Sequence, residues 1–280
     1  MKKYLPLLAV LSCSLTGCSK EISSAEAAEI ANDIRNTVIN PETIDTIKVN
    51  YSASDHIEGT NDSKVVDNKD DISYKFEASN KRNYLHMLFK TKSKDKIEDE
   101  TTSDERELWI YIKNKTLYQV NRVKSVGSET KKYTKIDNYG AAATEFVHLY
   151  NTYISTIYEA ARGYEYLDLD KFTNIFGEEY RKDIEFSEKY FSKKEGNLRV
   201  ATAAKIDKTY ETGVYVKGVG TATVKWNEYL LKSAASAYTL KVSDGTNKND
   251  YRRNYTLTHN VSKFFIATYP NLNKYALENR

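Results

Sequence analysis

The sequence predicts an α+β protein: a large curved antiparallel sheet with an N-terminal helix and a long helical insertion packed on it. Most of the chain alternates apolar and polar residues, which is typical of half-buried strands. Two segments instead place apolar residues three or four positions apart and predict helices. Consecutive strands interrupted by a helical segment are typical of α+β domains.

The chain begins with the pattern of a bacterial lipoprotein precursor. Lys2 and Lys3 are followed by an apolar run too short to span a bilayer, and then by Leu15-Thr16-Gly17-Cys18. These four residues resemble a lipobox; the alternative is an ordinary secretory signal with an incidental cysteine. The resemblance implies a signal peptide over residues 1–17, a diacylated Cys18, and a short tether over residues 18–23. The mature protein would then be anchored outside the cytoplasm, on the outer face of the cell membrane or on an outer membrane.

Cysteine and charge counts limit the possible functions. Cys13 leaves with the signal and Cys18 is acylated, so the mature chain would contain no free thiol and no disulfide. Without Lys2 and Lys3 the chain has 40 basic and 39 acidic residues, a formal net charge of +1. Nucleic-acid binding requires a clustered basic surface, so this balance argues against it. With only 3 prolines and 11 glycines, no linker divides the chain, and residues 24–280 are predicted to form one domain.

The first element is an amphipathic helix over residues 24–39. Ser23 and Glu26 have the spacing of a capping box. Apolar residues then recur every four positions, at Ile30, Ile34 and Val38.

Strands follow the helix. The alternation predicts strands over residues 46–57, 71–79, 83–93, 106–114, 115–123 and 131–136. The polar segments 58–71 and 92–106 are interpreted as connections. Residues 84–89 and 108–112 are apolar at nearly every position, which predicts strands covered on both faces, by helix on one and by another segment on the other. His86, which interrupts the first of these runs, is interpreted as a hydrogen-bonded core imidazole.

The period changes after Gly140. Apolar residues advance by three or four and predict a helix over residues 141–163, with a second, shorter helical piece over residues 168–177. Strand patterns then return: a hairpin over residues 184–206 that turns at residues 194–197, and further strands over residues 220–232 and 236–260. The tail, residues 261–272, is expected to be a strand or a short helix.

This order of elements resembles the LolA/LolB-type lipoprotein carriers and related lipid-binding lipoproteins. The resemblance lies in the N-terminal helix "AEAAEIANDIRNTVI", the meander "RELWIYIKNKTLYQV", the helical insertion at residues 141–163 and the later meander "GTATVKWNEYLLK". It implies that the sheet forms a half-open barrel, with an apolar cavity, lidded by helices, that accepts acyl chains.

The apolar residues of the first strands are the candidate cavity residues. They are Ile47, Val49, Tyr51, Tyr74, Phe76, Leu85, Met87, Phe89, Leu108, Ile110 and Ile112. The alternative interpretation is that they fill a solid core, and strand register alone does not separate the two.

No motif for catalysis or metal binding emerges. The four histidines, His56, His86, His148 and His259, are scattered without the spacing of a metal site. We therefore predict no enzyme activity, no cofactor and no metal. The predicted function is binding of a lipid or another hydrophobic ligand; the alternative is a surface adhesin or a subunit of an envelope complex with a filled core. The sequence identifies no protein partner.

Overall fold

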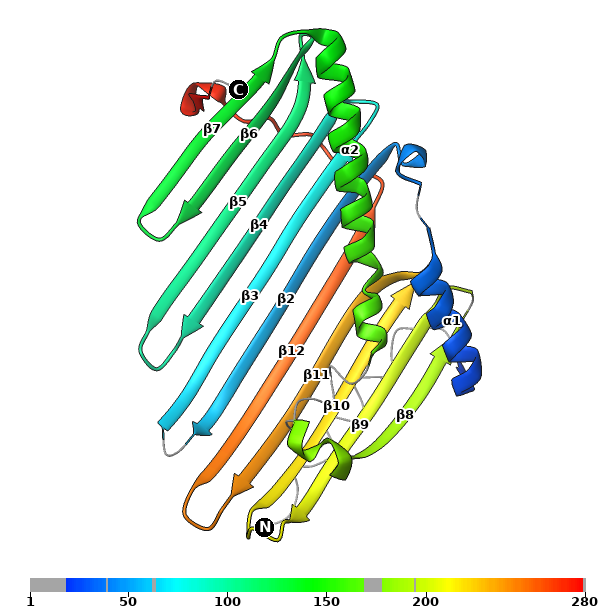
Figure 1. Ribbon diagram of the computed structural model, residues 1–280, viewed down its shortest axis with the longest axis vertical. Helices are drawn as coiled ribbons and strands as arrows, with labels where there is room; N and C mark the ends of the chain where they lie inside the picture. The colour runs from blue at the N-terminus through cyan, green and yellow to red at the C-terminus, as the bar shows by residue number, and fades with distance from the viewer. Residues whose placement is uncertain (1–18, 39, 62–63, 169–177, 194, 279–280) are drawn as a thin grey trace.

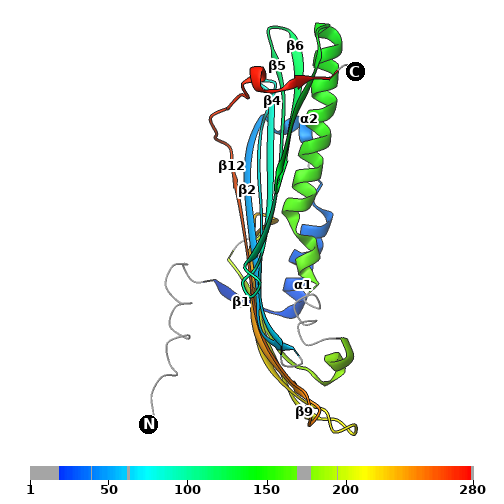
Figure 2. The same cartoon turned by 90° about the vertical axis from the view of Figure 1, so that its left-hand side faces the viewer.

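In the computed structural model, the protein is one open sheet with both helices on the same face (Figures 1 and 2). The structure describes residues 19–38, 40–61, 64–168, 178–193 and 195–278. Among these described residues, strands make up 59% and helices 21%. The predicted α+β half-open barrel is therefore wrong: the sheet has 13 strands, does not close, and dominates the fold.

The strands form two meanders that meet in the middle of the sheet. The strand order is β1-β8-β9-β10-β11-β12-β2-β3-β4-β5-β6-β7-β13, with all neighbours antiparallel except β7 and β13. The first meander comprises β2 (Thr46–Asn61), β3 (Lys64–Ser79), β4 (Tyr84–Asp95), β5 (Glu100–Lys113), β6 (Thr116–Ser125) and β7 (Ser128–Ile136). The second comprises β8 (Glu185–Ser192), β9 (Leu198–Thr209), β10 (Tyr215–Asn227), β11 (Leu230–Ser243) and β12 (Lys248–Ser262). The pairing of β12 with β2 joins the last long strand to the first.

The strands at the two edges of the sheet are short. β1 (Lys20–Ile22) pairs with β8, and β13 (Ala276–Leu277) pairs with β7. Short edge strands leave few unpaired backbone groups for another chain. The predicted tether over residues 18–23 is consequently shorter than expected, because Lys20–Ile22 already belong to the sheet.

The strands are longer than the alternation predicts, which is why the sheet outweighs the helices. β2 and β3 extend through most of residues 58–71, and β4 and β5 extend to within four residues of each other. These polar halves are held by the backbone ladder and by cross-strand ion pairs. Arg253 on β12 binds Asp55 on β2 at 2.7 Å, and Lys90 on β4 binds Glu105 on β5 at 2.8 Å.

The first helix, α1 (Ser24–Asn36), begins at the predicted capping box. The Ser23 hydroxyl accepts from the Glu26 N–H, and the Glu26 carboxylate accepts from the Ser23 N–H. Ala27 and Ile34 are buried in a core cluster that also contains apolar residues of β9, β10 and β11. The helix ends three residues before the predicted end, so Val38 is 91% exposed instead of facing the core.

The second helix, α2 (Tyr139–Arg162), lies obliquely across the sheet (Figure 1). It occupies the place of the predicted long helix. Shorter 3-10 turns lie at Pro41–Thr43, Tyr164–Leu167, Glu178–Asp183 and Leu272–Lys274.

The prediction that β4 and β5 are covered on both faces is confirmed. On one face α2 packs over Leu85 and Ile110. On the opposite face the C-terminal segment, residues 263–277, buries Phe265 against Tyr84 and Trp109. This segment is extended with one 3-10 turn, so the tail is neither the strand nor the short helix expected (Figure 2).

Candidate functional site

The candidate site lies beneath the C-terminal half of α2, where the space between the helix and the sheet is no longer filled by side chains. Its N-terminal half is packed tightly: Phe146, Tyr150 and Ile154 are at most 1% exposed and contact the apolar face of β2 to β6. Two hollows open on the same face farther along the helix. Their geometry follows from how the end of α2 is held.

Arg162 fixes the end of α2 to α1. Its buried guanidinium donates to the carbonyl oxygens of Arg35 at 3.0 Å and Thr37 at 2.6 Å, at the C-terminus of α1. These carbonyls have no partner inside the helix, so Arg162 satisfies them. The Arg162 carbonyl in turn accepts from the Trp226 indole N–H on β10 at 3.0 Å. Both helices are thereby attached to the second meander.

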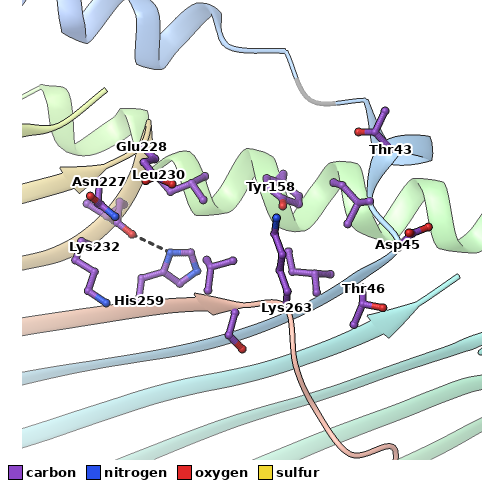
Figure 3. Close-up of a pocket in the computed structure, with 15 residues that line it drawn as sticks. Thr43, Asp45, Thr46, Tyr158, Asn227, Glu228, Leu230, Lys232, His259 and Lys263 are labelled. Carbon is purple, nitrogen blue, oxygen red and sulfur yellow. Dashed lines mark hydrogen bonds between the residues drawn. The ribbon is translucent and has the colours of Figure 1, made fainter. Parts of the chain in front are cut away.

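The larger hollow, about 690 Å³, lies between α2 and the strand ends of β2, β11 and β12 (Figure 3). Its apolar wall includes Ile44, Ile47, Tyr158, Leu231 and Val261. Charged side chains, among them those of Asp45, Lys232 and Lys263, surround this wall. Figure 3 shows the Lys263 ammonium directed toward Tyr158 under the helix. The hollow therefore combines an apolar wall with a cation.

The smaller hollow, about 380 Å³, is lined mainly by apolar and aromatic side chains. They are Tyr51, Ile72, Tyr74, Phe89, Tyr164, Tyr166 and Leu231, with Glu159, Ala160, Gly163, Glu165 and His259 completing the lining. Ile72 is 40% exposed and Phe89 39%, so apolar surface faces solvent here. Both volumes lie in the range typical of small-molecule sites, about 300–1,000 Å³.

His259 on β12 lies between the two hollows, because both are lined by His259 and Leu231. Its ring is buried, and burial lowers its pKa below the ordinary value, so the imidazole is neutral at pH 7. Nδ1 is 3.0 Å from the Leu231 carbonyl oxygen and therefore carries the proton. Nε2 must then accept, and the Tyr74 hydroxyl at 3.3 Å is its donor.

Tyrosines form the wall beside His259. The rings of Tyr51 and Tyr74 are stacked, with centroids 4.7 Å apart and an interplanar angle of 8°. The hydroxyls of Tyr166 and Tyr255 are 3.0 Å apart. Burial raises the pKa of Tyr51 and Tyr74 well above the ordinary value, and that of Tyr166 to about 12. The wall is thus uncharged at neutral pH and offers rings and hydroxyls, not nucleophiles.

The predicted cavity residues all lie on the α2 face of the sheet, but most of them fill the core. Tyr51, Tyr74 and Phe89 line the smaller hollow and Ile47 the larger one. The others are packed in the cluster under α2: Val49, Phe76, Leu85, Met87, Leu108, Ile110 and Ile112. For these seven, the solid-core interpretation describes the structure better than the cavity interpretation.

Several residues of the site were not predicted from sequence. His259, Leu231 and Lys263 come from the second meander and its end, about 200 positions after Tyr51. Tyr164 and Tyr166 lie in the 3-10 turn after α2. The strand alternation around His259 was the one available signal, because it places that ring on the buried face of β12.

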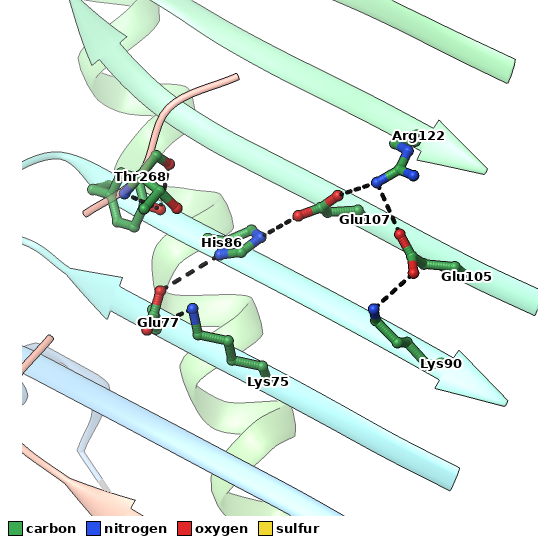
Figure 4. A network of polar contacts seen from close by, with 9 residues as sticks. Lys75, Glu77, His86, Lys90, Glu105, Glu107, Arg122 and Thr268 are labelled. Atoms are coloured by element: carbon green, nitrogen blue, oxygen red, sulfur yellow. Dashed lines mark hydrogen bonds and ion pairs between the residues drawn. The ribbon is translucent and has the colours of Figure 1, made fainter. Parts of the chain in front are cut away.

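A second cluster of titratable groups lies on the opposite face of the sheet (Figure 4). His86 Nε2 is 2.9 Å from Glu107, and His86 Nδ1 is 3.5 Å from Glu77, which is itself 2.9 Å from Lys75. The Glu107 carboxylate also lies 3.1 Å from the Arg122 guanidinium. The imidazole is stacked on Trp109, with ring centroids 4.9 Å apart. His86 is buried, as predicted, and its Nε2 is hydrogen-bonded to Glu107, whereas Nδ1 has only the ion-pair contact with Glu77. The network links β3 to β6.

Three potential metal ligands meet at His56, Glu58 and Asp67, whose ligand atoms lie within 4.8 Å of one another. The Lys96 ammonium lies 2.9 Å from Asp67 and 3.1 Å from His56. The Lys96 ammonium thus already occupies the position of positive charge that a metal ion would take between these ligands.

Two predictions fall outside the residues that the structure describes: Cys18 with its signal peptide, and the helical piece over residues 168–177, of which only Asp168 is described. No protein-family model and no curated protein sequence matches the chain. Among the described residues, no helix has the length and apolar character needed to cross a bilayer.

Proposed function

We propose that this protein is an extracytoplasmic lipoprotein, held on a bacterial membrane through acylated Cys18, that binds an amphiphilic lipid or a similar hydrophobic ligand beneath α2. The observation that carries the proposal is the smaller hollow with its uncharged aromatic wall of Tyr51, Tyr74 and Phe89, which meets a second, cation-bearing hollow at His259. We infer binding and not catalysis, because the tyrosine rings and the neutral imidazole of this wall offer no activated nucleophile.

The two hollows fit the two ends of an amphiphile. The aromatic hollow suits an apolar chain or ring, because burying apolar surface contributes about 25 cal/mol per Å². Lys263 forms no ion pair with another described residue, and it lies where an anionic head would emerge from the larger hollow. A ligand drawn from a membrane exchanges one apolar environment for another, so we expect moderate affinity and ready release.

The position of the anchor supports this function. Ser19 follows the predicted acylated residue directly, and β1 begins at Lys20. The sheet would therefore be held next to the membrane surface, which is the source of such ligands.

A substitution that fills the aromatic hollow tests the proposal. Ala160 lines this hollow from α2, whereas Ser155, also exposed, lies on another side of the helix. Binding of a dansyl-labelled medium-chain fatty acid would be measured by fluorescence for Ala160→Trp, for the control Ser155→Trp, and for the unmodified chain. We expect Ala160→Trp to bind at least ~10-fold more weakly, the equivalent of about 1.4 kcal/mol, and the control to bind normally.

The variant Lys263→Gln tests the larger hollow independently of the aromatic one. It is expected to weaken binding of the labelled fatty acid by up to about 5-fold, and to leave binding of the corresponding alcohol unchanged, because an exposed ion pair contributes at most about 1 kcal/mol. If no labelled ligand binds, or if Ala160→Trp binds as well as its control, the proposal is wrong. The alternative, an adhesin or envelope-complex subunit, would then be favoured.

A further inference from the structure

A third hollow, about 300 Å³, lies near one edge of the sheet, where β1, β8, β9 and β10 are neighbours. Its apolar lining comes from Phe191, Leu198 and Trp226. The remaining lining residues are Ser19, Ser192, Lys193, Asn197, Arg199, Lys225 and Asn227, and none of them is acidic. The pocket is therefore cationic, although the mature chain is nearly neutral overall.

Two of the cations face each other directly. Arg199 on β9 and Lys225 on β10 are opposite residues in the register, so their side chains leave the same face of the sheet. Like charges at opposite positions destabilise a sheet. Among the residues that the structure describes, no carboxylate forms an ion pair with either of them. The pair retains two positive charges that an anionic ligand would neutralise.

Arg199 also has unused hydrogen-bonding capacity. Its Nε is buried and has no hydrogen-bond partner. Its guanidinium lies over the Phe191 ring, 5.3 Å from the centroid, which holds the planar group in one orientation. A buried donor without a partner costs about 1–3 kcal/mol unless a ligand supplies an acceptor. A phosphate oxygen matches this donor, because the guanidinium fork binds phosphate through parallel hydrogen bonds.

The pocket lies beside the predicted anchor. Ser19 lines it, and Ser19 is the residue that directly follows Cys18 in the sequence. Because β1 is fixed to β8, this proximity does not depend on a long tether. A diacylglycerol group on Cys18 would place the bilayer headgroups at the mouth of the pocket.

We propose that this pocket binds the phosphate of an anionic phospholipid in the membrane that holds Cys18. Arg199 and Lys225 bind the phosphate oxygens, with Lys193 at the rim. The contact fixes the orientation of the sheet on the membrane surface, which a flexible lipid anchor alone does not. The inference rests on the anchored lipoprotein of the proposed function, but not on ligand binding beneath α2. A free phosphate has the same chemistry, and the test separates the two sources.

The test uses the chain from Ser19 to Arg280, which contains all the described helices and strands and lacks the anchor. Its binding to vesicles of phosphatidylglycerol mixed with phosphatidylcholine, and to vesicles of phosphatidylcholine alone, is measured by co-sedimentation. Arg199→Gln/Lys225→Gln is compared with Lys64→Gln/Lys124→Gln, which removes the same charge at exposed positions on β3 and β6. Each cation near an anionic membrane changes affinity by about 5-fold, so the pocket variant should bind about 30-fold more weakly. The control should lose less than about 3-fold, because its cations lie away from the pocket.

Three outcomes overturn the proposal: no preference for the anionic vesicles, equal losses in the two double variants, or a pocket variant that unfolds at a lower temperature than the unmodified chain. The last would indicate a structural role, whereas removal of a like-charge pair is expected to leave the melting temperature unchanged or raised. A melting temperature raised by inorganic phosphate, without any vesicle preference, would assign the site to a free anion and reject the lipid. Fatty-acid binding measured on the same variants tests the proposed function separately, since neither substitution lies beneath α2.

Discussion

Replacing His86 by phenylalanine removes the central cation of the network on β3 to β6. Two unit charges 4 Å apart interact by about 4 kcal/mol at an effective dielectric constant of 20, and His86 is within 2.9 Å of Glu107 and 3.5 Å of Glu77. Desolvation of a side chain that is 4% exposed offsets part of this energy. Removing one member of a buried ion pair costs about 3–5 kcal/mol. Glu77 keeps Lys75 and Glu107 keeps Arg122, so we expect the lower limit, about 3 kcal/mol at pH ~6.

The pKa shifts of His86 and Glu77 determine how the loss of stability in His86→Phe changes with pH. Burial acts to lower the pKa of His86, but the carboxylates of Glu107 and Glu77 outweigh it, and the pKa is raised above the ordinary value. A raised histidine pKa stabilises the folded state fully below about pH 6.5 and loses that contribution as pH rises through the folded-state pKa. Burial acts to raise the pKa of Glu77, but His86 and Lys75 outweigh it, so its contribution is lost as pH falls below the ordinary range. The cost of His86→Phe should therefore be larger at about pH 6 than at about pH 9.

Urea unfolding followed by tryptophan fluorescence measures both effects. Phenylalanine can retain the stacking on Trp109, so the variant isolates the charge and not the packing. His148→Phe, on the exposed side of α2, is the matched control and should change the free energy of unfolding by less than about 0.5 kcal/mol at either pH. If His86→Phe and the unmodified chain change equally between the two pH values, the imidazole is not protonated in the fold and the reasoning fails.

Two further predictions concern the helices. Phe146→Ala should reduce the free energy of unfolding by about 3–5 kcal/mol in the same assay, because Phe146 is 1% exposed between α2 and the sheet and the substitution leaves a cavity; a loss below about 1 kcal/mol would mean that α2 is not packed there. Arg162→Met should cost about 2–4 kcal/mol, since it removes the charged donor from the Arg35 and Thr37 carbonyls, and should speed amide hydrogen exchange at the end of α1. Unchanged exchange would show that Arg162 does not hold the two helices together.

Local patterns predicted the elements whose stability depends on local or buried contacts. The capping box of Ser23 and Glu26 marks the start of α1 because the bonds that form it lie within four residues. The apolar runs of β4 and β5 predicted cover on both faces because burial selects apolar residues at every position. The same alternation placed all the cavity candidates on the correct face of the sheet.

The fold class was predicted wrongly because the spacing of apolar residues indicates which positions are buried, and not which segments pair as strands. The polar halves of β2 to β5 show no apolar alternation, and so they were interpreted as connections. Their ladders and ion pairs, such as Lys90 with Glu105, hold strands that no core covers. Strand lengths estimated from apolar residues are therefore too short in a sheet that extends beyond its helices.

The candidate site was only partly predictable because it depends on the strand order. β12 lies beside β2, so Arg253 binds Asp55 across 198 positions and His259 reaches Tyr74 across 185. Nothing in either segment alone indicates the other. The position at which α2 crosses the sheet decides the role of each apolar residue. Tyr51 lines a hollow, whereas Phe76 fills the core.

Native mass spectrometry of the protein purified from its membrane, together with solvent extraction of the same sample, tests the binding function most directly. We predict a bound amphiphile of lipid mass that is lost on denaturation, and that is absent or greatly reduced in Ala160→Trp but retained in Ser155→Trp. A chain that carries no such species and takes up none from added vesicles would contradict the account.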